Sequence, residues 1–579
     1  METGIDLRRE RGLWLVLALV LLIRAPFLNQ AIQGDEDTYL REASHALVDP
    51  LHPANTTYVF RGEPVDLRGH SHPPLNAWIL GGLIAVVGGV REVPFHAAYI
   101  LFSLIAATAM WTLARRFSPH PLWATLLFLA VPAFVVNGNS LETDLPFLAF
   151  WMAAVACFCA GRMALAAAAM ALATMTAYQA VLLVPILGVY CWMYRRRERS
   201  AWLVLATPFA VVAAWQIFER FTTGAMPASV LSGYFTKYGF QALGPKLRNA
   251  LMLFIHSWFI VFPLLFARLW RKRAEPFLLA WIGIFFAGAI VLFFAGSARY
   301  LLPMAAPVVL LASRLDTRWL AGGFAAQMAL SLGLSVVNYQ HWDGYRKFVP
   351  GQPHMWVNGE WGLRHYLEEG GALPLTRTQP VRAGDFIVTS DLGRAVEVAA
   401  PTVPVRQLEI RPWIPLRLIG LESHSGYSTV SAGFYPFGIS RSVIDRVRLV
   451  KVVERSITLE YLPMNAPEAS DQIISGIYAL ENQGSRWMSR RAVVALKRPA
   501  ASMPLSVNFY ISPTARARRV SLSLDGREVA SHTYDAPGAY TLKSGPVIGS
   551  VAAIEVDQTF TAPPDMRELG IVLLGVGFQ

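Results

Sequence analysis

The chain has 579 residues, of which 54% are hydrophobic and only 16% are charged, and its mean hydropathy is +0.39. Soluble domains carry about a quarter charged residues, so the composition excludes an entirely soluble protein and predicts an integral membrane protein with a soluble part. The net charge of +12 lies largely in short clusters between apolar segments, such as 195–199 and 268–273. Such clusters are typical of membrane orientation signals, so we expect no nucleic-acid partner.

The first 338 residues contain a series of apolar segments. The first of them, 13–28, is not followed by a small-residue cleavage site, so we expect a retained anchor and not a signal peptide. A spanning helix needs about 20 apolar residues. On this basis we expect about eleven spans, at 12–29, 95–114, 120–137, 144–161, 163–178, 179–194, 201–219, 249–269, 276–295, 300–314 and 318–338.

The apolar segment 74–90 is ambiguous, and the arginines decide its placement. If it lies in the membrane interface without crossing, all the arginine clusters fall on one side, which the positive-inside bias makes the cytoplasm. These are Arg8, Arg9, Arg11, Arg115, Arg116, Arg162, Arg195–Arg197, Arg199, Arg268, Arg271–Arg273, Arg314 and Arg318. We therefore expect a juxtamembrane helix at 74–90, a cytoplasmic N-terminus and a C-terminal region outside the membrane.

An acidic cluster, Asp35-Glu36-Asp37, follows the first apolar segment at the outer face. An aspartate at a membrane–water boundary can act as a general base on an acceptor hydroxyl or amine. A neighbouring glutamate can orient the acceptor or pair with an arginine. The alternative is a solvated loop whose acids cap the start of a helix.

Two further outer-face motifs carry polar side chains. In "RGHSHPPL", His72 stands before two prolines, where it either meets a phosphate or begins a helix. In "SLETDLP", Glu142 and Asp144 precede a span. They either help to bind an acceptor, a sugar or a divalent cation, or they stabilise a helix N-terminus.

Arginines at the outer face are candidate phosphate ligands. In "GSARYLLP", Arg299 lies beside Tyr300 at the end of a span. A guanidinium binds phosphate oxygens in a bidentate manner, and the alternative is an interfacial arginine that extends its head group to water. Arg24, inside the first apolar segment, is a candidate buried partner for a carboxylate. Arg61 and Arg68 are further candidates in the outer loop.

The order of these motifs resembles the GT-C membrane glycosyltransferases, in particular the group of protein O-mannosyltransferases and lipid A aminoarabinose transferases. The matching elements are Asp35-Glu36, Tyr39, His72-Pro73-Pro74-Leu75, Asp144 and Arg299-Tyr300-Leu301-Leu302-Pro303. The resemblance covers about residues 10–340. Two departures matter. His72 replaces a lysine, and Tyr178-Gln179 stands where many relatives carry a lysine.

The resemblance implies an inverting hexosyl or pentosyl transfer from a polyprenyl-phosphate sugar to a lipid, glycan or protein acceptor at the outer face. Asp35 would deprotonate the acceptor, and Glu36 would orient it or pair with an arginine. The donor phosphate would be held by Arg299, His72 and Tyr300. The acceptor or sugar would contact Asp144, Glu142, Tyr39 and Gln179.

No cofactor is implied, although a divalent cation at the acidic residues stays open. No His/Cys spacing indicates a structural metal site. The implied location is a bacterial inner membrane, with the C-terminal domain in the periplasm. Two alternatives remain: a transporter or flippase for a lipid-linked sugar, and a non-catalytic glycan-binding assembly protein. The motifs gather at one face and no internal repeat is visible, which favours the enzyme over the transporter.

The composition changes near residue 339. We expect a GT-C transmembrane catalytic domain at 1–338, a small α/β segment at 339–404 and an extracytoplasmic β-sandwich, jelly-roll-like, at 405–579. Alternating segments and the "LDGRE" hairpin signal support the sandwich. Trp487 in "GSRWMSRR" belongs either to the core, which we favour, or to a sugar-stacking surface.

Overall fold

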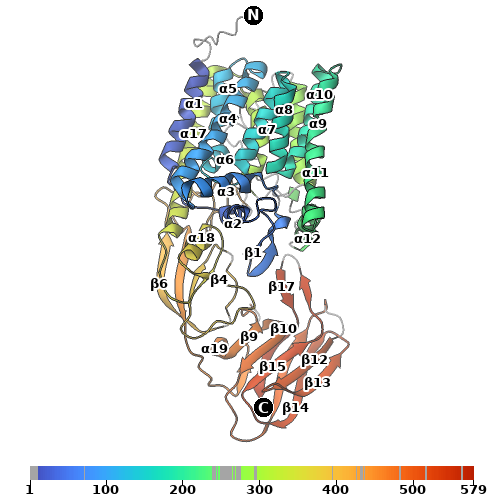
Figure 1. Ribbon diagram of the computed structural model, residues 1–579. Helices are drawn as coiled ribbons and strands as arrows, with labels where there is room; N and C mark the ends of the chain where they lie inside the picture. The colour runs from blue at the N-terminus through green and yellow to red at the C-terminus, as the bar shows by residue number, and fades with distance from the viewer. Residues whose placement is uncertain are drawn as a thin grey trace, which may run out of the picture.

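The computed structural model joins a bundle of apolar helices to a β-rich C-terminal region (Figure 1). It describes residues 11–70, 72–237, 275–292, 297–393, 395–398, 400–425, 437–481, 484–514, 518–562 and 565–579, with residues 243, 246, 247, 264, 268, 427, 428, 430 and 435 between them. The predicted combination of a helical membrane part and a C-terminal β-rich part is confirmed.

The bundle helices overlap the expected spans. They are α1 (Arg11–Arg24), α4 (Glu92–Phe117), α5 (Pro121–Leu129), α6 (Pro132–Asn137), α7 (Asp144–Cys159), α8 (Met163–Thr176), α9 (Leu183–Tyr194), α10 (Arg199–Val204), α11 (Thr207–Thr222), α15 (Pro276–Val291), α16 (Leu302–Ala312) and α17 (Thr317–Arg346). Within the described ranges, three helical stretches are long and apolar enough to cross a membrane: Glu92–Phe117, Arg199–Thr222 and Thr317–Arg346. The expected span 249–269 lies almost wholly outside the described residues, and the count of eleven stays a prediction.

Helices α2 (Glu36–Ala46) and α3 (Leu75–Val87) lie across the lower end of the bundle in Figure 1, between the bundle and the sheets. α3 has 13 residues, which is too short to cross a bilayer. It ends at Gly88, whose φ of 79° gives the left-handed conformation that terminates a helix. This placement agrees with the expectation that 74–90 does not span.

The described arginine clusters gather at the other end of the bundle. Arg314 donates to Phe117 O at 3.3 Å, which joins the turns after α4 and α16. Arg195 donates to Cys159 O at 3.3 Å, which joins the turns after α7 and α9. α4 and α16 start at the end that faces the sheets, because Glu92 accepts from the Tyr366 hydroxyl at 2.9 Å and Ala298 N donates to Tyr427 O at 2.8 Å. α7 starts there too, because Asp144 pairs with Arg299 just before α16. The turns after these helices therefore lie at the far end. Arg8, Arg9 and Arg271–Arg273 lie outside the described residues, so their placement on the cytoplasmic side stays a prediction.

Arg24 does not bind a carboxylate, so that expectation is wrong. Its guanidinium donates to Val135 O at 2.6 Å, to Phe134 O at 2.8 Å and to Ser103 Oγ at 3.1 Å. These carbonyls belong to the last turn of α6, where Phe134 O also accepts from Gly138 N at 3.0 Å and intrahelical donors run out. Arg24 therefore caps a broken helix inside the bundle, where an unpaired carbonyl is costly.

We expect Gly138→Ala to lower stability by about 1–3 kcal/mol, because a Cβ at this position would lie 1.7 Å from the Arg24 guanidinium and displace it from the α6 carbonyls. The matched control is Gly82→Ala in α3, where a Cβ meets no atom within 4 Å and alanine favours the helix. Thermal unfolding in detergent measures both. Equal midpoints for the two variants would contradict this role of Arg24.

Outside the bundle, a hairpin of β1 (Thr57–Phe60) and β2 (Glu63–Asp66) precedes a five-stranded sheet. The sheet order is β4 (Leu373–Pro374), β3 (Met355–Asn358), β5 (Phe386–Ser390), β7 (Asp445–Val452) and β6 (Thr402–Ile410), with helix α18 (Gly362–Glu369) after β3. The expected boundary at 404/405 falls inside β6. The sheet extends to Val452 because β6 pairs with β7, a contact across a 34-residue connection that local patterns do not reveal.

The last region is a nine-stranded antiparallel structure with its own core. Its strands are β8 (Tyr461–Pro463), β9 (Ile473–Ile477), β10 (Arg486–Ala495), β11 (Met503–Ile511), β12 (Arg518–Leu524), β13 (Arg527–Tyr534), β14 (Gly538–Val547), β15 (Val551–Val556) and β18 (Val572–Phe578). β10 pairs with β15 along one part and with β18 along another, so it links two layers. Trp487 is half-buried. Its ring and the Phe560 ring form an edge-to-face contact with 5.8 Å between their centroids, which suits packing within this region.

Candidate active site

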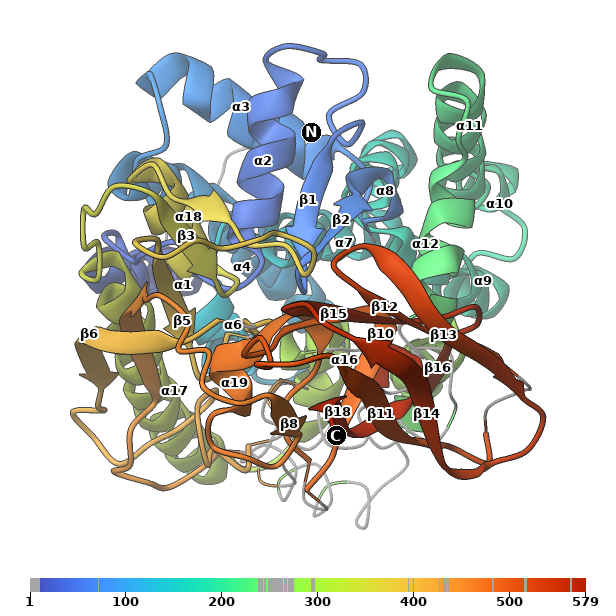
Figure 2. The ribbon, with the colours of Figure 1, turned by 90° about the horizontal axis from the view of Figure 1, so that it is seen from below.

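A cavity of about 530 Å³ lies where the bundle meets the five-stranded sheet. Its walls come from the start of α2, the β1–β2 hairpin, the α6–α7 turn, the short helices η3 (Tyr178–Leu182) and η4 (Ala298–Leu301), and the outer part of α17. In Figure 2, which looks at this end of the bundle, α2 and the β1–β2 hairpin lie beside α18 and the five-stranded sheet. Among the predicted site residues, the cavity lining includes Asp35, Glu142, Gln179, Arg299 and Tyr300.

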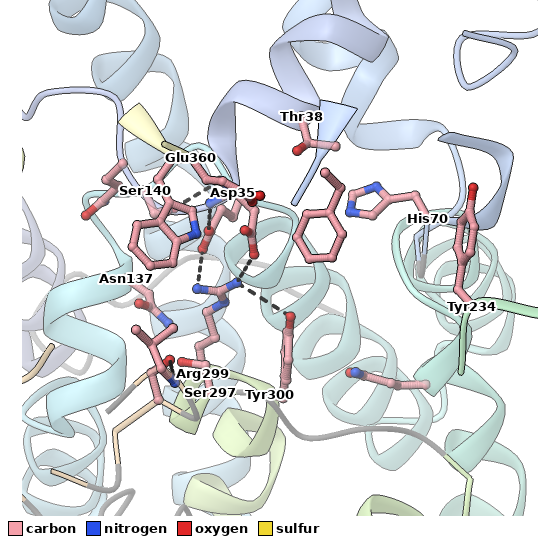
Figure 3. A pocket seen from close by; sticks show the side chains of 18 of the residues that line it. Asp35, Thr38, His70, Asn137, Ser140, Tyr234, Ser297, Arg299, Tyr300 and Glu360 are labelled. Carbon is pink, nitrogen blue, oxygen red and sulfur yellow. Dashed lines mark hydrogen bonds and ion pairs between the residues drawn. The ribbon is translucent and has the colours of Figure 1, made fainter. Parts of the chain in front are cut away.

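Arg299 is the centre of the site (Figure 3). Its Nη1 lies 2.8 Å from Glu142 Oε2, its Nε lies 2.8 Å from Asp144 Oδ2, and its Nη2 lies 3.4 Å from Asp35 Oδ2. Nη2 is also 3.5 Å from the Tyr300 hydroxyl. Residues more than 260 positions apart in the sequence therefore meet around one guanidinium.

The three carboxylates differ in exposure, and this divides their roles. The side chain of Asp35 is 49% exposed, whereas those of Glu142 and Asp144 are 3% and 6% exposed. Burial raises the pKa of Glu142, and the nearby Arg299 charge opposes this shift. Glu142 and Asp144 hold the guanidinium from behind, while Asp35 makes the longest contact and faces the cavity.

Backbone contacts fix Asp35 at the start of α2. Its amide donates to Glu142 Oε1 at 3.0 Å. Gly34 precedes it with a φ of +48°, and a Cβ there would lie 2.6 Å from the same oxygen. The Asp35 side chain makes no capping hydrogen bond to the helix. The helix-cap alternative therefore does not describe this carboxylate.

Glu36 lies outside the cavity lining and pairs with backbone instead of with an arginine. Its Oε1 accepts from Leu141 N at 2.8 Å and its Oε2 accepts from Gln33 N at 3.0 Å. Complete burial raises its pKa to about 7, against the opposing effect of these two amides. Among the described contacts, Glu36 pairs with these amides and not with an arginine, and its carboxylate ties the first outer loop to the α6–α7 turn.

His72 is buried outside the lining, and His70 takes the place in the cavity that His72 was expected to occupy. Burial, with the nearby His70 and Arg299 charges, lowers the pKa of His72 well below its ordinary value. His72 lies outside the cavity lining, so its contact with a phosphate stays a prediction. His70 Nδ1 lies 3.1 Å from Glu42 Oε1. Burial lowers the pKa of His70, but Glu42 raises it more, so the net shift is upward.

The other predicted residues divide between the lining and its support. Gln179 lines the cavity together with Tyr178, whose hydroxyl accepts from Gln216 Nε2 at 3.0 Å. Tyr39 lies outside the lining, with ring centroids 4.8 Å from His70 and 5.8 Å from His72. Tyr39 thus supports the histidine and has no direct access to a ligand.

The two outer-loop arginines are used locally. Arg68 forms a bidentate pair with Asp66, with Nη2 to Oδ2 at 2.6 Å, and donates to Thr223 O at 3.2 Å. The Arg61 guanidinium lies over the Phe60 ring at 5.3 Å. Both arginines lie outside the cavity lining.

Residues from the C-terminal region close the cavity and were missed. Glu360 and Trp361 line it from the loop between β3 and α18, and Tyr427 lines it from the β6–β7 connection. The Tyr427 hydroxyl donates to Asn137 Oδ1 at 2.5 Å, and Tyr427 O accepts from Ala298 N at 2.8 Å. The acidic-aromatic pair in "NGEWGL" was a usable signal, whereas nothing in the sequence around Tyr427 indicated the cavity.

Metal binding has little support from the described side chains. Across the ranges that the structure covers, no group of three or more His, Cys, Asp or Glu residues is placed to hold an ion. The acidic residues converge instead on the Arg299 guanidinium, which supplies the positive charge at their centre.

Comparison with known proteins finds one family model that matches part of the chain. Residues 71–218 match the family model described as dolichyl-phosphate-mannose-protein mannosyltransferase. No curated protein is significantly similar to the chain in sequence.

Three solved structures are similar at low identity. ArnT from Cupriavidus metallidurans bound to undecaprenyl phosphate has 15% identity and a TM-score of 0.44, over 65% of this chain and 93% of that one. The Saccharomyces cerevisiae Pmt1–Pmt2 complex bound to the sugar donor has 16% identity and a TM-score of 0.30, over 38% and 34%. The arabinofuranosyltransferase AftD from Mycobacteria has 12% identity and a TM-score of 0.41, over 98% and 58%.

The matched segment runs from the residues just before α3 to the end of α11, and it includes the "HPPL" and "ETDLP" motifs. It covers the part of the bundle that contributes Glu142, Asp144 and Gln179 to the site. The family match confirms the resemblance to the protein O-mannosyltransferase group of GT-C membrane glycosyltransferases.

Proposed function

We propose that this membrane protein transfers a sugar from a polyprenyl-phosphate donor to an acceptor at the face of the membrane that carries the sheets. Asp35 removes the proton from the acceptor hydroxyl or amine as the acceptor atom forms its bond to the anomeric carbon. The bond from that carbon to the phosphate oxygen breaks, and polyprenyl phosphate leaves with inversion. The observation that carries the proposal is the contact of a cavity-facing Asp35 with Arg299.

The weak Asp35–Arg299 contact suits a substrate-dependent exchange. Glu142 contacts Nη1 of Arg299 and Asp144 contacts Nε, so Nη2 is the nitrogen that faces the cavity. The contact of Nη2 with Asp35 is longer than the contacts with Glu142 and Asp144. The phosphodiester of the donor carries one negative charge, as Asp35 does, and its non-ester oxygens accept from Nη2 in place of the carboxylate. Asp35 then gives up its contact with Arg299 and is released toward the acceptor when the donor is in place.

His70 supplies a second positive charge for the phosphate in place of His72. Glu42 lies 3.1 Å from the imidazole and favours its protonated form. The other groups around His70 are Tyr39, the neutral His72, Asp35 and Arg299. This charge matters because Glu142 and Asp144 already neutralise much of the Arg299 charge.

We expect Glu42→Gln to lower kcat/KM for the donor by about 10-fold near pH 7, the worth of one charge-assisted hydrogen bond. Removal of Glu42 lowers the pKa of His70, so the imidazolium is lost at a lower pH and the alkaline limb of the pH profile moves down. The matched control is Asp49→Asn, which breaks another His–carboxylate pair (His52, 2.9 Å) outside the cavity lining. An unchanged alkaline limb in Glu42→Gln would rule out this role.

The placement in the cell is also a proposal. Eleven spans and the positive-inside bias put the arginine end of the bundle in the cytoplasm. The site then opens to the periplasm of a bacterial inner membrane. The domains would be the bundle to residue 338, the five-stranded sheet to about residue 452 and the nine-stranded region after it. The acceptor is a lipid, a glycan or a protein.

The test is a transfer assay with the purified chain, radiolabelled polyprenyl-phosphate sugars and a membrane extract as the source of acceptors. We expect label to move from the donor to an acceptor and polyprenyl phosphate to be released. The same donors are also given to proteoliposomes without acceptor. Movement of intact donor across the bilayer with no transfer to any acceptor would replace the enzyme with a transporter.

A further inference from the structure

The segment 411–416, which follows β6, runs along α17 toward the bundle. Trp413 N donates to Gln340 Oε1 at 2.7 Å, and Gln340 Nε2 donates to Arg411 O at 3.2 Å. Leu416 then lies against Gly333, with Cδ1 2.9 Å from the position that a Cβ would take. Gln340 and Gly333 are about 10 Å apart along the helix at 1.5 Å per residue. In Figure 1, β6 points toward the bundle, so the chain that follows β6 turns at the lower edge of the bundle.

This segment reaches beyond the level of the cavity. Asn338 marks that level, because it lines the cavity and donates to Gln33 Oε1 at 2.7 Å. Gly333 is a further five residues into the bundle, or about 7 Å. It lies within Thr317–Arg346, one of the helices long and apolar enough to span. The segment therefore contacts a part of α17 that belongs to the membrane.

After Arg411, which is exposed and pairs with Glu409 at 2.6 Å, the segment consists of apolar residues. Trp413 is 75% exposed and Ile439 is 77% exposed. Ile439 lies beside the segment because Gly438 N donates to Arg417 O at 2.8 Å. Large apolar side chains exposed on a soluble surface can mark an interaction site.

The backbone of the segment is also suited to an apolar environment. Pro412 and Pro415 have no N–H group to leave unpaired. Trp413 N is bonded to Gln340, and Leu416 N donates to Ile414 O at 2.7 Å. Non-helical backbone at membrane depth is tolerated where its polar groups are satisfied against protein. Arg411 O and Trp413 N of this loop are satisfied in this way against α17.

We propose that residues 411–416 and Ile439 form a wedge that inserts into the lipid interface next to α17, with Trp413 as its anchor. Tryptophan favours this zone because its ring is apolar and its N–H stays near water. The occupant is the lipid surface, which is continuous with the exposed face of α17. The wedge holds the five-stranded sheet, and with it Glu360 and Trp361, at a fixed height over the cavity. The proposal rests on the membrane placement given above and not on the transfer chemistry.

The test uses the full chain in phosphatidylcholine vesicles with a nitroxide label at Trp413→Cys. Collision with oxygen, which is enriched in lipid, is compared with collision with a water-soluble nickel complex. Leu15→Cys on α1 serves as the lipid-exposed reference, and Ile548→Cys in the nine-stranded region serves as the water-exposed reference. The unsubstituted chain, with Cys157, Cys159 and Cys191, gives the background.

We expect the Trp413 label to favour oxygen, as the Leu15 label does, and Ile439→Cys to give the same result if the first variant folds poorly. Labels at both positions that favour the nickel complex, as at Ile548, would overturn the proposal. The readout needs no substrate, so a chain without transferase activity still gives a decisive result. A failed transfer assay with an inserted wedge would therefore reject the proposed function alone.

Discussion

Asp35→Asn lowers kcat by about 10²–10⁴-fold, the usual contribution of a positioned general base, while donor binding is retained. The asparagine side chain has the size of the aspartate side chain but cannot take the proton from the acceptor. We expect helix α2 and the loop before it to be unchanged, because the backbone N–H of residue 35, and not its side chain, binds Glu142. The measurement is initial-rate kinetics with a polyprenyl-phosphate sugar and saturating acceptor.

The control for this variant is Asp37→Asn. Asp37 is two residues away in the same acidic cluster but contacts His365 at 3.4 Å and lies outside the cavity lining. We expect it to keep most of the wild-type kcat once folding has been verified. Equal rates for Asp35→Asn and wild type would remove Asp35 from the mechanism, whatever the result for Asp37.

Arg299→Met abolishes donor binding and also destabilises the protein by about 3–5 kcal/mol. The stability loss arises because Glu142 and Asp144 are buried at 2.8 Å from the guanidinium and lose their only shared cation among the described contacts. Removal of one partner of a buried ion pair costs more than removal of the whole pair. Thermal unfolding in detergent and binding of labelled polyprenyl phosphate report the two effects separately.

A triple variant separates structure from function at this site. Arg299→Met with Glu142→Gln and Asp144→Asn removes the uncompensated charges, so we expect it to recover much of the lost stability. It should still fail to bind the donor phosphate, because no guanidinium faces the cavity. A triple variant that binds the donor normally would show that the arginine serves the fold only.

The sequence predicted that several residues from distant parts of the chain would meet at one end of the bundle, as those in the cavity do. Asp35, Glu142 and Arg299 each stand at the outer end of an apolar segment, and charge at a membrane boundary is uncommon enough to mark a site. The crosswise helix at 74–90 followed from the arginine distribution, with support from its glycines and its opening prolines. These features were accessible because membrane topology limits which segment ends can meet.

The errors concern side-chain direction and long-range contacts. "GHSH" places two histidines within three residues, and only the fold shows that His70 faces the cavity while His72 is buried. Glu36 stands beside Asp35 in the sequence, but the turn into α2 directs it to the backbone of residue 141. Tyr427 comes from a loop about 130 residues after Arg299, a contact with no local pattern. Such partners depend on packing between distant segments.

The most direct test of the central claim is a side-selective transfer assay in proteoliposomes of known orientation, with a short-chain, water-soluble polyprenyl-phosphate sugar added to one face at a time. The account predicts transfer only when the donor is added to the face that carries the C-terminal sheets, and loss of this transfer in Asp35→Asn. Transfer from the face that carries the arginine clusters, or no transfer with any donor at either face, would contradict it.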